Sequence, residues 1–157
     1  RMSIDIDKLR QFSMQVQLRE LRPVLMTAEL LSDFSKELRL DPSVSLEVQR
    51  GEGRFSVLAR FGLRGIRRDD EPPVFMFKYH VVASYIYRGD EDPSDELLRE
   101  FSETSSMVHL WPYFRAHVQT SASLLQFPQP LVIPTFIPGS LRKRVEESET
   151  EIAEEEA

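Results

Sequence analysis

The stretch Phe75 to Tyr87 constrains the fold of this chain more than any other feature of the sequence. Every second position is apolar or aromatic, namely Phe75, Phe77, Tyr79, Val81, Ala83, Tyr85 and Tyr87. A period of two is typical of a β-strand. The alternate positions add Met76, Val82 and Ile86, beside Lys78, His80 and Ser84. A strand that is apolar on both faces is covered on both. We therefore expect helices of the same chain on one face, and a partner, a loop or a bound polypeptide on the other.

Three earlier segments show the same period. Met14, Val16 and Leu18 alternate with polar residues, and the phase slips at Leu21. Pro23 cannot donate to a strand ladder, so it predicts a bulge, a bend or an edge position. The apolar run 24–31 is interpreted as a continuation of this strand, with a short helix as the alternative. The polar residues 32–42 are expected to form a connection.

The second and third strands follow that connection. Val44, Leu46 and Val48 alternate with polar residues. Gly51 to Gly53 predicts a tight turn, because glycine accepts a positive φ. The third strand presents Phe55, Val57, Ala59, Phe61 and Leu63 on one face. The sequence thus predicts four strands before any long helix.

Helical signals begin after residue 90. Asp92 is a suitable N-cap with Pro93 at the first helical position, so a short helix is expected there. A longer helix is expected to begin near Ser105 or Ser106, or at Pro112, which otherwise predicts a kink. The helical spacing of its apolar positions defines the expected buried face: Leu110, Phe114, Val118 and Leu125. The fold class expected is α+β, a four-stranded antiparallel sheet with the C-terminal helices packed on one side.

The C-terminal part divides into an extended segment and an acidic tail. Leu131 to Pro138 contains prolines at 134 and 138, and we expect it to lie on a surface in an extended conformation. Residues 146–157 hold seven of the 26 acidic residues and no lysine or arginine. Such a composition buries too little apolar surface to offset its ordering entropy. The expected organisation is therefore one domain, 1–142, and a disordered tail, 143–157.

Several function classes are disfavoured by composition. Without the tail, 19 acidic residues face 20 basic ones, so a nucleic-acid partner is not expected. The absence of cysteine excludes thiol catalysis and fits an intracellular setting. His109 and His117 are eight residues apart, which is not a spacing that stacks two ligands on one helix face. No catalytic residue, metal, cofactor or membrane insertion is expected.

The ordered motifs of residues 109–138 resemble the SecB family of export chaperones. Leu110-Trp111-Pro112-Tyr113-Phe114-Arg115 matches the aromatic-Pro-Tyr-x-Arg segment that leads the long helix of that family. Phe127-Pro128, Leu131 and Ile133-Pro134 follow in the family's order. The strand half resembles the family in pattern only.

The resemblance implies a cytoplasmic homotetramer, a dimer of dimers with the long helices between the dimers. It also implies a holdase that keeps preproteins unfolded and passes them to the SecA ATPase. A SecB-like subgroup instead protects an antitoxin, and that alternative stays open. Outside this class, a small-ligand-binding or enzymatic α+β domain is the alternative.

The same resemblance suggests site residues. Expected client-binding residues are Phe34, Leu38, Leu40, Leu46, Trp111, Phe127, Leu131, Phe136 and Ile137. Phe114, Val118 and Leu125 are expected at the oligomer interface. Glu20 and Glu29 are the nearest candidates for the acidic positions that contact SecA, although Arg19 and Arg22 lie among them.

Overall fold

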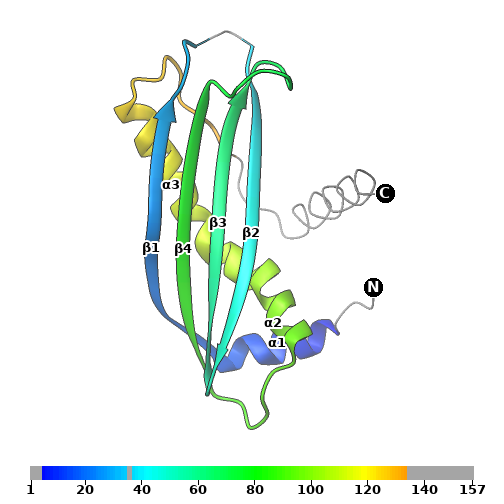
Figure 1. Ribbon diagram of the computed structural model, residues 1–157. Coiled ribbons are helices and arrows are strands. Elements are labelled where there is room, and N and C mark those ends of the chain that lie inside the picture. Colours follow the sequence, from blue (N-terminus) through cyan, green and yellow to red (C-terminus); the bar gives the residue numbers. More distant parts are fainter. Residues whose placement is uncertain (1–4, 35–36, 134–157) are drawn as a thin grey trace.

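A computed structural model describes residues 5–34 and 37–133 of the chain. Its core is one four-stranded antiparallel sheet with the strand order β1-β4-β3-β2 (Figure 1). Helix α3 runs along one face of this sheet, and the other face carries no helix of the described chain (Figure 1). The predicted α+β class and the one-sided helix packing are confirmed.

The four strands are long. They are β1 (Val16–Leu30), β2 (Arg39–Gly51), β3 (Arg54–Ile66) and β4 (Phe75–Tyr87). The first therefore includes residues 24–30 of the run 24–31 that was interpreted as strand, and it pairs with β4 along its whole length. Register shifts at Leu18/Glu20 and Pro23/Leu25 confirm the irregularity predicted near Pro23.

The central strand β4 separates two different environments. Its odd-numbered side chains face α3 and, apart from Tyr87, are buried, whereas its even-numbered ones are half-buried or exposed on the helix-free face. On the helix side, β3 adds Phe55, Val57, Ala59, Phe61 and Leu63 to the core. The helix-free face is called the outer face below.

A helix that the sequence analysis missed precedes the sheet. This helix is α1 (Ile6–Gln15), and it contains Met14. Its N-cap is Asp5, whose side chain accepts a hydrogen bond from the Asp7 amide. Phe12 anchors α1 by stacking on Phe55 and meeting Phe101 edge-on. The predicted start of the first strand at Met14 was therefore wrong, because Phe12 reaches the core from a helix.

The C-terminal helices form one continuous rod with a change of pitch in the middle. Its parts are α2 (Asp95–Phe101), a π-helical segment η1 (Ser102–Ser106) and α3 (Met107–Leu124). The N-cap of α2 is Ser94, whose hydroxyl accepts from the Leu97 amide, and not Asp92 as predicted. Neither Ser105 nor Ser106 caps α3, because the helix enters it from η1 without a break.

Pro112 lies inside α3 rather than at its start. Proline has no backbone N–H, so the Val108 carbonyl lacks the hydrogen bond that it would otherwise accept from residue 112. Both residues lie on the exposed side of the helix, where water can satisfy that carbonyl. This placement explains why the helix continues through the proline.

The connection between β1 and β2 crosses the end of the sheet. The two strands occupy opposite edges, so the chain passes over the ends of β4 and β3 (Figure 1). Three strand spacings of about 4.8 Å give a crossing of about 14 Å, well within the reach of eight residues. We call residues 31–38 the crossover; positions 35 and 36 lie outside the described residues.

Candidate functional site

The outward side of α3 has an unusual composition for a helix on a subunit surface. A surface helix normally carries charged residues opposite its apolar stripe. Here the exposed positions include Val108, Tyr113, Ala116, Thr120 and Leu124, and no exposed residue of α3 is an acid, a lysine or an arginine. Leu124 is 79% exposed and Tyr113 50%. This uncharged helix face is a surface suited to burial against another polypeptide.

The edge strand β1 adds a second apolar surface. Its exposed large apolar side chains are Val24, Leu25, Met26 and Leu30, and Leu31 follows directly. The strand also presents its unpaired backbone groups at the sheet edge, because its one sheet partner is β4. Exposed apolar edge strands are sites of pairing with further chains.

An aromatic cluster joins the crossover to the end of α3. The Phe34 ring meets the Phe127 ring edge-on at 4.4 Å between centroids, and Phe127 also lies 5.0 Å from Phe75. Phe127 follows the helix end, where Gln126 adopts a positive φ of 57°. Phe34 and Phe127 keep part of their surface exposed, and Leu38 and Leu131 are also half-buried against the core. Two of the predicted client-binding residues, Phe34 and Phe127, thus meet in this cluster.

Arg67 forms hydrogen bonds with the crossover next to Phe34. Its guanidinium donates to the Ser32 hydroxyl at 2.5 Å and to the Asp33 carbonyl at 3.3 Å. The contact links the crossover to the end of β3, 34 residues further along the chain. The part of the crossover next to Phe34 is therefore held by a residue at the end of β3 and not by the crossover alone.

The remaining predicted client-binding residues divide. Leu46 is half-buried on β2 and Leu40 is exposed near its start. Trp111 is buried, with its ring 5.9 Å from Phe61 and 5.5 Å from Phe114. Trp111 therefore belongs to the core of the described chain, and its predicted role in client binding stays a prediction. Phe136 and Ile137 lie outside the described residues.

The predicted interface residues lie mainly in the core of the subunit. Phe114 and Val118 are fully buried, and the Phe114 ring stacks on Phe61 at 4.9 Å. Leu125 is half-buried at the helix end. A helical apolar period identifies the buried stripe of a helix but cannot say which polypeptide buries it. Here the sheet of the same chain buries it.

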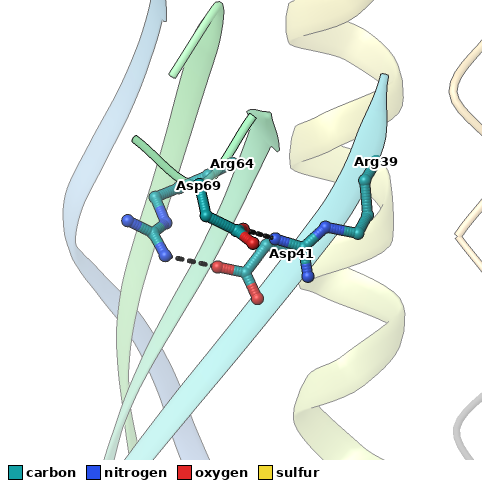
Figure 2. A network of polar contacts seen from close by, with 4 residues as sticks. All are labelled: Arg39, Asp41, Arg64 and Asp69. Carbon is teal, nitrogen blue, oxygen red and sulfur yellow. Dashed lines mark hydrogen bonds and ion pairs between the residues drawn. The ribbon is translucent and has the colours of Figure 1, made fainter. Parts of the chain in front are cut away.

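Glu20 and Glu29 both lie exposed on the outer face of β1. They do not form an acidic surface together, because Arg22 lies between them on the same face. Across the sheet, Asp41 pairs with Arg64, and Asp69 with Arg39 (Figure 2). Glu47 pairs with Arg60 at 3.0 Å. The outer face is thus a mixed-charge surface.

Two of the three histidines join helix α3 to the sheet. His117 packs on the Tyr79 ring, and its Nε2 donates to the Thr27 carbonyl at 3.1 Å, which ties α3 to β1. His109 Nδ1 is 3.1 Å from the Tyr85 hydroxyl. Burial lowers the pKa of His109 and raises the pKa of Tyr85 to about 12. Within residues 5–34 and 37–133, no cluster of histidine and acidic side chains could hold a metal ion.

Comparison with solved structures finds a strong likeness to a SecB-like chaperone. The match is to the SecB-like chaperone Rv1957 of Mycobacterium tuberculosis, solved in complex with a ChAD peptide from the HigA1 antitoxin. It covers 83% of this chain and 97% of that one, with a TM-score of 0.73 and 20% identity. The chain has a SecB-like fold.

The sequence comparisons add nothing to the SecB-like fold assignment. No family model and no curated protein matches the chain. In this SecB-like fold the motif 110–115 lies inside α3, and the Phe127-Pro128 pair lies just past its end. None of the helices in the described part of the chain is long and apolar enough to cross a membrane.

Proposed function

We propose that this protein is a holdase, a chaperone that buries apolar segments of unfolded polypeptides without catalysis. The observation that carries the proposal is the uncharged face of α3, continued by the exposed apolar edge of β1. Burial of apolar surface contributes about 25 cal/mol per Å² whatever sequence supplies it. Such surfaces therefore bind other polypeptides with affinity but little selectivity.

We assign the two uses of these surfaces to different regions. The α3 face, with Val108, Tyr113 and Leu124, would be covered by a sister subunit in a dimer of dimers. The aromatic cluster would bind clients through Phe34, Phe127 and Leu131, continued by Leu38, Leu40 and Leu46. Phe136 and Ile137 are proposed to extend this client site.

The favoured client is an antitoxin-like segment. The structural neighbour was solved with an antitoxin peptide, and the outer face of β1 lacks a continuous acidic surface around Glu20 and Glu29. Delivery of preproteins to SecA through those two glutamates is the second candidate, with a cytoplasmic location in both cases.

An aggregation assay tests the holdase proposal. The protein in subunit excess should suppress light scattering by a chemically denatured model protein diluted into buffer. Phe34→Ser and Phe127→Ser should weaken the suppression, whereas Gln129→Ser, a change at an exposed position near the cluster, should not. Absence of suppression by the unmodified protein would refute the proposal.

Self-association is tested separately by light scattering after size exclusion. Tyr113→Arg and Leu124→Arg place charge on the α3 face and should reduce the oligomer to smaller species. The control substitution Gln11→Arg, at an exposed position of α1, should leave the oligomer unchanged. If the unmodified chain is a monomer at all concentrations, the assignment of the α3 face to a sister subunit is wrong.

The two client branches separate in a binding experiment. Immobilised SecA should retain the protein, and Glu20→Lys with Glu29→Lys should abolish that retention, if the export branch is right. Lack of retention, together with tight binding of an antitoxin encoded beside this protein, would support the antitoxin branch.

A further inference from the structure

The outer face of the sheet separates its charges by strand. Cross-strand register places Arg54, Arg60 and Arg64 of β3 on this face, with Lys78 of β4 beside them. Among the outward positions of these two central strands there is no acidic residue. The acidic positions of the face, including Glu29 and Asp41, lie on the edge strands. We call the four central cations the basic stripe.

The basic stripe is partly neutralised and partly open. Glu47 pairs with Arg60, and Asp41 pairs with Arg64 (Figure 2). No ion pair within the described residues joins Arg54 or Lys78 to an acid, and both side chains are exposed. The pKa of His80, between Arg60 and Lys78, is lowered by partial burial and by these two cations. A positive potential therefore lies over the middle of the sheet.

Apolar side chains also lie on the outer face between the charges of the basic stripe. Leu58, Met76, Val82 and Ile86 are half-buried on the same face, and no helix of the described chain crosses it (Figure 1). An acidic segment with an occasional aliphatic residue would fit this pattern. The chain contains one: residues 146–157 carry seven glutamates and Ile152.

We propose that this acidic tail, Glu146–Ala157, docks on the basic stripe of its own subunit. Twelve residues separate Ile133, the last described residue, from Glu146, and the thirteen Cα–Cα steps between the two can span about 43 Å. That exceeds the width of a four-stranded sheet, about 14 Å, so the tail can pass an edge and reach the outer face. A tether of this length gives an effective concentration in the mM range, at which weak ion pairs suffice.

The lengths of the two surfaces agree. From Arg54 to Arg64 the stripe extends for ten residues of β3, about 33 Å. Twelve extended residues reach about 40 Å. The tail would then cover the part of the outer face where another acidic polypeptide could bind, and it would do so independently of the proposed holdase activity.

Zero-length carbodiimide cross-linking tests the docking in the full chain. The reagent joins a lysine Nζ to a carboxylate in direct contact, and the chain has four lysines: Lys8, Lys36, Lys78 and Lys143. We expect peptides that link Lys78 to glutamates of 146–156 at about 0.01 M salt. The yield should fall roughly fivefold or more at about 1 M salt, where the screening length is near 3 Å. Lys143, adjacent to the tail, is the internal control for carboxylate reactivity.

Charge reversal and isotope mixing complete the test. Arg54→Glu with Arg60→Glu should remove the Lys78 links, whereas Arg10→Glu with Arg99→Glu, an equal change of net charge on exposed helix positions, should not. In a refolded mixture of ¹⁴N and ¹⁵N chains, the Lys78 links should carry a single isotope. If Lys143 forms links and Lys78 does not, the proposal is wrong. Lys78 links of mixed isotope would also overturn it, because they would assign the tail to another copy of the chain.

Discussion

Replacing Phe114 with alanine should separate core packing from assembly on α3. Phe114 is fully buried, and its ring stacks on Phe61 and lies against Trp111. Removing a buried phenylalanine side chain costs about 3–5 kcal/mol. Because folded domains have only about 5–15 kcal/mol of stability, this is a large share of the total.

The assay is urea unfolding followed by the fluorescence of Trp111, the single tryptophan of the chain. With an m-value of about 2 kcal/mol per M, a loss of 4 kcal/mol shifts the midpoint by roughly 2 M. All variants are compared at one subunit concentration, since self-association adds to apparent stability by mass action.

Tyr113→Ala is the matched control, because Tyr113 is the next residue and is half exposed. At a subunit concentration low enough for the chain to be monomeric, its midpoint should shift by no more than about 0.5 M, since it removes a side chain that is exposed in the lone subunit. If Tyr113→Ala lowered the midpoint more than Phe114→Ala, the assignment of Phe114 to the core and of Tyr113 to the free face would be refuted.

Three further predictions concern the sheet and its contacts with the helices. Gly65→Ala should lower the free energy of unfolding in urea by about 1–3 kcal/mol, because a Cβ there would lie 2.2 Å from the buried Phe75 ring. Gly53→Asn, at a φ of 64°, should be tolerated. Equal losses of stability in the two variants would contradict this reasoning. Tyr85 has a pKa raised from 10.0 to about 12 in the folded chain, so stability should fall as pH rises from 10 toward 12, and Tyr85→Phe should unfold with a flatter profile over that window. Burial lowers the pKa of His109 below 6.5, so the stability contributed by its neutral form should be lost as pH falls below 6.5. The thermal unfolding temperature of His109→Gln should therefore vary less between pH 7.5 and 5 than that of the unmodified chain. An unchanged pH profile in the variant would exclude His109 as a source of that dependence.

The sheet was predictable because its strands carry a strong two-residue period. In β4 the alternation continues for thirteen residues, and its buried side chains lie on the face toward α3. The N-terminal helix was not predicted, although Asp5 and Asp7 are a readable helix start. The reason is that Met14 continues the alternation of Val16 and Leu18, so the local pattern favours a strand that the packing of Phe12 overrides.

The candidate site was less accessible to sequence reasoning. The period of Leu110, Phe114 and Val118 gave the buried stripe of α3, but the stripe faces the sheet of the same subunit. The informative signal was the near absence of charge: the eighteen residues of α3 include one acid, lysine or arginine, namely Arg115, so the outward side has no charged stripe. Cross-strand register, which places all outward charges of β3 and β4 as cations, depends on contacts between distant segments and could not be read locally.

The position of β1 at the edge beside β4 also has a consequence for synthesis. Val16 pairs with Tyr87 and Leu30 with Phe75, so the first strand has no partner until β4 has been translated. The three later strands can form a meander as they emerge, since each follows its neighbour in the chain and in the sheet. We therefore expect β1 to add last, and to remain an open, apolar segment until β4 has emerged from the ribosome.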